Sequence, residues 1–466
     1  MEIDNKHSDG GVVLKKNKYE IDMCNGSIMN KLISFSLPLM ISGILQLMFN
    51  AVDIIVVGQF TGSEALAAVG STTALIAVFT NLFIGISLGA NVLAARFYAA
   101  GKHKEMSDTV HTSITLALIS GIVMAFAGLL FSRLALEIMA TPDNVIDQST
   151  LYMRIYFLGM PFFMLYNYGA AILRAVGDTK RPLLYLIISG LANAGLNMLL
   201  VIVFHMGVAG VAIGTIVSQF ISCVLVLRCL YCSDSSYQLR FSRLTIKGKY
   251  AEQIFQVGIP AGIQSTVINL SNALLQSSVN SFGSVAMAGY TAANNIFGFL
   301  YVSVNSVTQS CMSFTSQNYG VRKTKRMDRV LLDCAVLSFV FSFTLGCGAY
   351  FFGDKLLRLY TSDPDVIQCG IEILAYTTVP YFCCGIMDLI PGALRGMGHS
   401  GVPMILSIIG TVGTRIVWIF GLFPHHRSLS FLFISYPTSW ILTIVMQVIC
   451  FYFVRRKVHR NILTQR

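Results

Sequence analysis

Stretches without Asp, Glu, Lys or Arg recur along the whole chain, and short charged segments separate them. A helix needs about 20 apolar residues to cross a hydrocarbon core that is ~30 Å thick. Seven of the stretches have the length of one such helix, and each of them predicts one membrane-spanning helix. They are residues 32–52, 65–95, 109–132, 155–173, 334–353, 396–414 and 428–454.

Three further segments complete the hydrophobic pattern. Residues 182–227 are long enough for two helices, with a turn expected at 205–210. Residues 253–321 also fit two helices, which we expect to be joined near 281–284. A last helix is expected at 371–393. The pattern therefore predicts an all-α polytopic membrane protein with twelve transmembrane helices.

Composition and charge support this class of protein. The 466 residues are 55% hydrophobic and 12% charged, whereas an ordinary soluble domain has about 25% charged residues. Of the Lys and Arg residues, 27 lie in segments predicted on the side of the membrane that holds both chain ends, and 4 lie on the other side. Because cytoplasmic loops are enriched in Lys and Arg, we expect a cell-membrane protein with both termini in the cytosol. Since the net charge of +11 resides in these loops, we do not expect nucleic-acid binding.

The two halves of the chain resemble each other at a shift of 221 residues. Both halves contain a Leu-Arg pair that is followed by a Gly three residues after the Arg and by a Pro five residues after that Gly. This pattern occurs at 173–182 and again at 394–403. Each half holds six predicted helices, so both halves enter the membrane from the same side. This arrangement predicts two six-helix lobes related by a pseudo-two-fold axis along the membrane normal, with a binding site between them. We expect a mobile cytosolic tail at 1–30, a first lobe at 31–232, a cytosolic linker at 233–252, a second lobe at 253–454 and a cytosolic tail at 455–466.

Several short motifs occur in order along the chain: residues 53–58, 62–70, 89–101, 173–182 ("LRAVGDTKRP") and 207–212 ("GVAGVA"). Together with the repeat, their order over about 420 residues resembles the multidrug and toxic compound extrusion (MATE) family of transporters. The resemblance implies secondary efflux driven by proton or sodium entry, with a V-shaped cavity between the two lobes.

Asp53 is the most informative single residue, because it is a carboxylic acid in the first predicted span. An acid at the membrane centre costs about 2.5–3.5 kcal/mol on insertion scales, so it usually faces a cavity or a partner. Ser42, Gln46, Asn50 and Asp53 share one helix face. Burial favours the neutral acid, so we expect Asp53 to take up a proton from outside and release it inward. The alternative is an interfacial acid that stabilises the helix end.

The resemblance also indicates partners for this acid. In proton-coupled members of the family, the first-span acid works with an Asn-x-x-x-Asp pair on the fifth span. Here these positions are Asn193 and Asn197, so the second carboxylate is missing. Thr215 on the sixth span matches another family position near this cluster. We therefore predict an ion-coupling site in the first lobe at Asp53, Gln46, Asn50, Asn193, Asn197 and Thr215; for the two asparagines, hydrogen bonds between helices are the alternative.

The second lobe carries a neutral polar row on its first helix. Ser265, Asn269, Asn272, Gln276 and Asn280 recur at helical spacing, a pattern suited either to a wet cavity or to a hydrogen-bonded seam between helices. Two charged residues lie in later spans, Asp388 near the inner end of its helix and Arg415 deeper. This difference in depth argues against an ion pair between them. Our candidates for the substrate cavity are Asn269, Asn272, Gln276, Asp388 and Arg415.

The chain contains no motif of an ATPase, a metalloprotease or a serine hydrolase, so we do not expect an enzyme. We also expect no cofactor and no metal site, because the Cys229–Cys232 pair has no second pair beside it. The favoured function is an antiporter that exports amphiphilic, often cationic, drugs or toxic metabolites in exchange for protons, with sodium as the second candidate ion. The alternative function is a flippase for lipid-linked saccharides. The expected partners are membrane lipid and a small amphiphilic substrate, and we expect a monomer.

Overall fold

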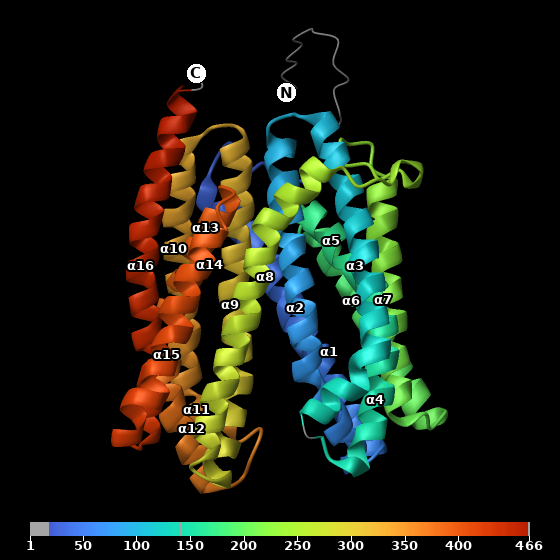
Figure 1. Cartoon of the computed structure of the whole chain (residues 1–466), viewed down its shortest axis with the longest axis vertical. Helices are drawn as coiled ribbons and strands as arrows, with labels where there is room; N and C mark the ends of the chain where they lie inside the picture. The colour runs from blue at the N-terminus through green and yellow to red at the C-terminus, as the bar shows by residue number, and fades with distance from the viewer. Residues whose placement is uncertain (1–17, 140, 465–466) are drawn as a thin grey trace, which may run out of the picture.

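The computed structural model describes residues 18–139 and 141–464, and these residues form helices joined by short loops. The first lobe contains six spans, in which α4 and α5 are two halves of one span (Figure 1). A π-helical segment, Met198–Val203, extends α6. The helices of this lobe are α1 (Ile28–Phe60), α2 (Ser63–Ala99), α3 (His103–Ile138), α4 (Asp143–Leu158), α5 (Met160–Ala175), α6 (Lys180–Asn197) and α7 (Gly207–Tyr231).

The second lobe repeats this order. Its fifth span is irregular, because the π-helical segments Ile408–Gly413 and Trp418–Leu422 flank the short helix α15. Its helices are α8 (Gly248–Asn280), α9 (Ser284–Gly320), α10 (Thr324–Phe351), α11 (Gly353–Leu357), α12 (Pro364–Thr377), α13 (Tyr381–Gly396), α14 (Gly401–Ser407), α15 (Thr414–Val417) and α16 (Leu429–Thr464).

The spans agree with the twelve predicted from the sequence. Eight single helical stretches are long and apolar enough to cross a membrane, and two bent pairs add two more. The pairs α4–α5 and α12–α13 bend by 47° and 48°, next to Pro161 and Pro380. The remaining spans, α8 and α9, have 33 and 37 residues. Their polar residues lower their hydropathy, so length identifies these two spans better than apolar character does.

Among the helix crossings at which the two lobes meet, two are related to each other by the repeat. At the crossing of α2 and α8, a Cβ atom on Gly85 would lie 2.3 Å from the Gly262 backbone, and one on Gly89 would lie 2.1 Å from the Ile254 carbonyl oxygen. At the crossing of α1 and α9, the hydroxyls of Ser36 and Ser310 are 2.8 Å apart. Small residues therefore permit close backbone contact between the lobes.

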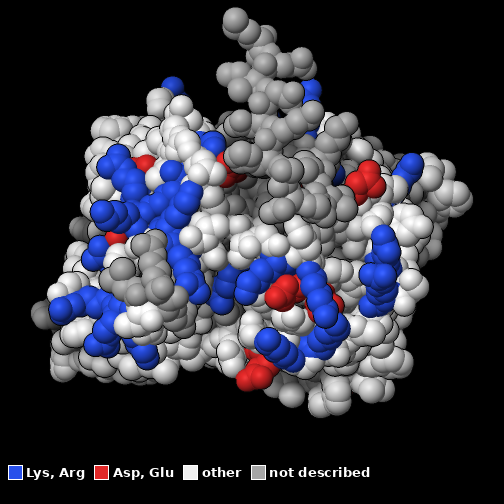
Figure 2. Space-filling model, turned by 90° about the horizontal axis from the view of Figure 1, so that it is seen from above, with Lys and Arg blue, Asp and Glu red and all other residues white. Residues whose placement is uncertain are grey.

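More contacts between the lobes lie near the face where α1 begins and α16 ends, which we call the terminal face. Gln317 on α9 donates to the Ala175 carbonyl oxygen at 2.7 Å. The Arg96 guanidinium lies 4.5 Å from the centre of the Tyr319 ring. Away from this face the helices of the two lobes diverge (Figure 1). Lys and Arg side chains gather on the terminal face itself (Figure 2).

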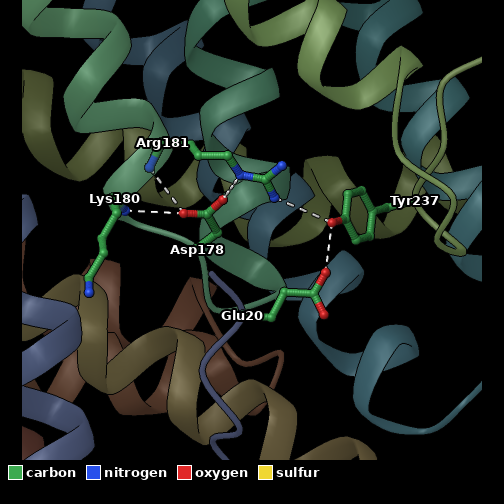
Figure 3. A network of polar contacts seen from close by, with 5 residues as sticks. All are labelled: Glu20, Asp178, Lys180, Arg181 and Tyr237. Carbon is green, nitrogen blue, oxygen red and sulfur yellow. Dashed lines mark hydrogen bonds and ion pairs between the residues drawn. The ribbon is translucent and has the colours of Figure 1, made fainter. Parts of the chain in front are cut away.

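The prediction of a mobile N-terminal tail at 1–30 is wrong for residues 19–30. Residues 19–27 lie against both lobes, and α1 already begins at Ile28. Glu20 accepts hydrogen bonds from Tyr98 and Tyr237 of the first lobe and its linker, beside the Asp178–Arg181 pair (Figure 3). From the second lobe, Arg326 donates to three carbonyl oxygens of this segment, those of residues 23, 25 and 26. Residues 1–17 of the expected tail lie outside the described residues.

One other predicted boundary also needs correction. The linker ends before residue 252, because α8 begins at Gly248. The segment predicted as the C-terminal tail, 455–466, is helical as far as the structure describes it, since α16 continues to Thr464. Charged residues therefore continue these helices beyond the apolar segments, where side chains can reach water. Counting uncharged residues locates the span within the membrane but underestimates the length of the helix.

Candidate functional site

Asp53 lies in the half of α1 that is remote from the terminal face, and its side chain is half-buried. Asn197, the last residue of α6, is fully buried and donates from Nδ2 to Asp53 Oδ1 at 2.5 Å. The π-helical segment begins directly after this asparagine, and such irregular turns are common at functional sites. The structure thus joins the first and fifth spans of this lobe through an acid and an amide.

The surroundings of Asn197 hold this amide in place. Its Nδ2 also lies 3.3 Å from Oδ1 of Asn193, which is one turn earlier on α6. Gly214 on α7 leaves the space that the amide occupies, because a Cβ atom there would lie 2.3 Å from Asn197 Oδ1. That oxygen is buried and accepts no hydrogen bond within the described part of the chain. It is therefore a free acceptor next to a carboxyl group.

Two tyrosines that the sequence does not predict for this site lie near its acid. Tyr152 and Tyr156 on α4 lie within electrostatic range of Asp53. Their rings stack with centroids 6.1 Å apart. The spacing of four residues places both on one helix face. Tyr152 lies outside the span predicted at 155–173, because charged residues precede that span, whereas α4 begins at Asp143.

The other predicted members of the ion site are not bonded to the pair of Asp53 and Asn197. Gln46 and Asn50 are exposed, and no hydrogen bond in residues 18–139 and 141–464 connects either of them to this pair. The Thr215 hydroxyl donates to the Val211 carbonyl oxygen of its own helix at 2.9 Å. Helical spacing predicts that these polar residues share one face of α1, but it does not show which of them reach α6.

A second polar cluster lies inside the second lobe. Arg415 on α15 is only 3% exposed. Its Nη1 donates to Oδ1 of Asn272 on α8 at 2.8 Å, and its guanidinium carbon lies 4.3 Å from the centre of the Tyr436 ring. The Tyr436 and Tyr290 hydroxyls are 3.5 Å apart. Of the predicted cavity residues, the structure therefore brings together Arg415 and Asn272, and it adds two tyrosines.

The remaining cavity candidates lie elsewhere. Asn269 is exposed, and Gln276 donates to Asn280 one turn further along α8 at 3.2 Å. Asp388 on α13 lies within electrostatic range of Arg395 on the same helix. The ion pairs of the described residues do not include one between Asp388 and Arg415.

Comparison with known proteins identifies the same repeat. The MatE family model matches residues 38–200 and again 260–420. The chain is 28% identical over 442 residues to a probable multidrug resistance protein, YoeA, of Bacillus subtilis, covering 92% of this chain and 95% of the relative. It is 26% identical to the probable multidrug resistance protein NorM of Thermotoga maritima, covering 84% of each chain. It is 24% identical to the multidrug export protein MepA of Staphylococcus haemolyticus, covering 84% of this chain and 87% of the relative.

Solved structures show the same fold. A multidrug resistance MATE family transporter in an outward-facing conformation has a TM-score of 0.88 and 19% identity, with 96% of this chain and 100% of that chain covered. A MATE transporter in a straight conformation has a TM-score of 0.85 and 20% identity, with 95% of this chain and 99% of that chain covered. Because the family model matches both lobes over most of the chain, the protein belongs to the MatE family, the multidrug and toxic compound extrusion transporters.

Proposed function

We propose that this protein is a secondary antiporter of the cell membrane that exports amphiphilic, often cationic, compounds in exchange for protons. The names of its relatives support multidrug export. The observation that carries the coupling mechanism is the contact between Asp53 and Asn197. Asp53 can change its charge, whereas the amide cannot. A proton on Asp53 removes the negative charge that attracts the Asn197 amide and so weakens the connection between α1 and α6.

The distribution of charge supports an orientation with the terminal face in the cytosol. Lys and Arg gather on that face (Figure 2), as the positive-inside rule expects. With this orientation, the lobe contacts at Gln317 and Arg96 close the cytosolic side. The conformation is then outward-facing, and Asp53 lies toward the external half of the membrane. A proton from outside would reach this acid before inward opening.

We favour protons over sodium as the coupling ion. A dedicated cation site surrounds the ion with several oxygen ligands. The described site offers the single carboxyl group of Asp53 and the amide oxygens of Asn193 and Asn197. A single acid is sufficient to carry one proton.

The alternative function, a flippase for lipid-linked saccharides, is less well supported. A pyrophosphate would need several basic groups, and the deep cluster of the second lobe contributes only Arg415.

Transport in proteoliposomes tests this proposal. The purified protein would be reconstituted, and export of tetraphenylphosphonium would be measured with a proton gradient or a sodium gradient imposed separately. We expect the proton gradient to drive export and Asp53→Asn to reduce it at least about 100-fold, because two protonation states become one. Asp147→Asn, an exposed acid on α4, is the matched control and should transport normally. Undiminished proton-driven export by Asp53→Asn would overturn the coupling role, and export driven only by sodium would overturn the choice of ion.

A further inference from the structure

Each lobe contains a polar bridge between its first and fifth spans, and the charged groups of the two bridges have opposite sign. In the first lobe, Asp53 on the first span bonds Asn197 on the fifth span. In the second lobe, Asn272 on the first span bonds Arg415 on the fifth span. At a shift of 221 or 222 residues, Asn272 corresponds to Asn50 and Arg415 lies within one helical turn of the residue equivalent to Asn197. Thus each lobe places one charged group between the same two helices, an acid in one and a base in the other.

The charge of Arg415 has no counterion within the described residues. Its side chain is almost fully buried, and none of the described ion pairs includes it. Asn272 supplies a neutral acceptor and Tyr436 a ring face. The Nε–H group is buried and has no acceptor in the part of the chain that the structure describes. A buried, uncompensated charge at membrane depth is costly and marks a functional site.

We infer that Arg415, Asn272 and Tyr436 form a binding site for a compact anion, such as a carboxylate. The guanidinium presents a planar fork of N–H donors that binds a carboxylate through two parallel hydrogen bonds. The unused Nε–H is one of these donors, and an Nη group is the second. The anion supplies the counterion that Arg415 lacks among the described residues, and it lies in the plane of the guanidinium, one face of which Tyr436 continues to cover.

This inference rests on the proposed export function where it concerns the substrate. The carboxylate would belong to the exported compound, so zwitterionic and acidic amphiphiles are substrates as well as cations. Free chloride carries the same compact negative charge and is the alternative anion for this site. Asp53 in the first lobe and Arg415 in the second attract opposite charges, and we therefore expect a compound with both an amine and a carboxylate to be a better substrate than a simple cation.

Binding of benzoate and of its neutral analogue benzamide tests the site without any transport. The two tryptophans of the chain report on it, because Trp418 is three residues after Arg415 and the Trp440 ring lies 5.6 Å from the Tyr436 ring. We expect benzoate to change tryptophan emission saturably and benzamide to have no such effect. Arg415→Gln should weaken benzoate binding at least about tenfold, whereas Arg415→Lys should retain part of it. Arg154→Gln, an exposed guanidinium on α4, is the control and should bind as the unaltered protein does.

A second variant keeps the test informative if Arg415→Gln fails to fold. Asn272→Asp places a carboxylate on the residue that Arg415 already contacts, so the site gains an internal counterion. This variant should fold, resist heat at least as well as the unaltered protein, and lose benzoate binding. Competition by chloride in place of gluconate would show that the site also accepts a free anion. Equal benzoate affinity in the unaltered protein, Arg415→Gln and Asn272→Asp would overturn the site, as would benzamide binding as tightly as benzoate. Since no gradient is used, these results are independent of whether the protein transports tetraphenylphosphonium.

Discussion

At the scale of single residues, the candidate ion site depends on a residue without a side chain. Gly214 faces the buried Asn197 amide, and this amide in turn contacts Asp53. The contact therefore needs three spans, with α7 holding an α6 residue against α1. An added methyl group at Gly214 must displace the amide, because the clash involves a buried side chain that cannot move into water.

We predict that Gly214→Ala weakens transport by separating Asn197 from Asp53. The expected effects are a loss of about 1–3 kcal/mol in stability, which is typical of overpacking in a core, and a several-fold lower rate of proton-driven export. Gly195→Ala on α6 is the control, because a Cβ atom there meets nothing within 4 Å. Thermal unfolding and proteoliposome export measure the two effects. If both alanine variants behaved like the unaltered protein, Gly214 would not position the amide.

At the scale of helices, the crossing of α2 and α8 holds the lobes together. Gly85 and Gly89 face Gly258, Gly262 and the Ile254 carbonyl oxygen across this crossing. The contact is made between backbones, so no side chain can rotate away to relieve a clash. Any residue larger than glycine at the tightest position must push the helices apart.

We therefore expect Gly89→Ala to separate the lobes near the terminal face. The built Cβ atom lies 2.1 Å from the Ile254 carbonyl oxygen, so the helices must shift. The variant should unfold at lower temperature and export more slowly. Gly70→Ala on the same helix should be harmless or slightly stabilising, because a Cβ atom at Gly70 has open space and alanine favours helix. Spin labels on α2 and α8 would measure the distance between the helices; an unchanged distance and unfolding temperature in Gly89→Ala would contradict the prediction.

At the scale of the whole molecule, residues 19–27 connect the two lobes across the terminal face. Glu20 contacts the first lobe, and the Ile21 amide donates to the Gly177 carbonyl oxygen at 3.3 Å. Lys323 and Arg326 of the second lobe bond the backbone of residues 23–26. Rocking of the lobes to open this face must break one of these two sets of contacts.

We predict that the double variant Lys323→Ala, Arg326→Ala makes opening of the terminal face easier. Hydrogen–deuterium exchange in residues 19–27 should become faster, because the segment loses the side-chain donors that hold its carbonyl oxygens, so that its own N–H groups, such as that of Ile21, open more often. Lys325→Ala removes an exposed lysine from the same helix start and serves as the control. Unchanged exchange in the double variant would show that these contacts do not hold the face closed.

The number of spans, the repeat and the presence of an acid in the first span follow from the sequence alone. Hydrocarbon excludes charge over a fixed thickness, so the length of each uncharged run reports a span without knowledge of its neighbours. The pairing of Asp53 with Asn197 was also predicted, through the resemblance to the MATE family. The local pattern of residues therefore determines the number and order of the spans and places an acid in the first of them.

Only the tertiary structure decided which polar groups meet. Tyr152 lies within electrostatic range of Asp53 and Tyr436 covers Arg415, while Gln46 remains outside both clusters. Helical spacing specifies the face on which a residue lies, but the rotation of each helix and the depth at which it crosses its neighbours arise from packing between spans. The same reason explains the bridge between Asn272 and Arg415, which are 143 residues apart and meet because two helices of one lobe lie side by side.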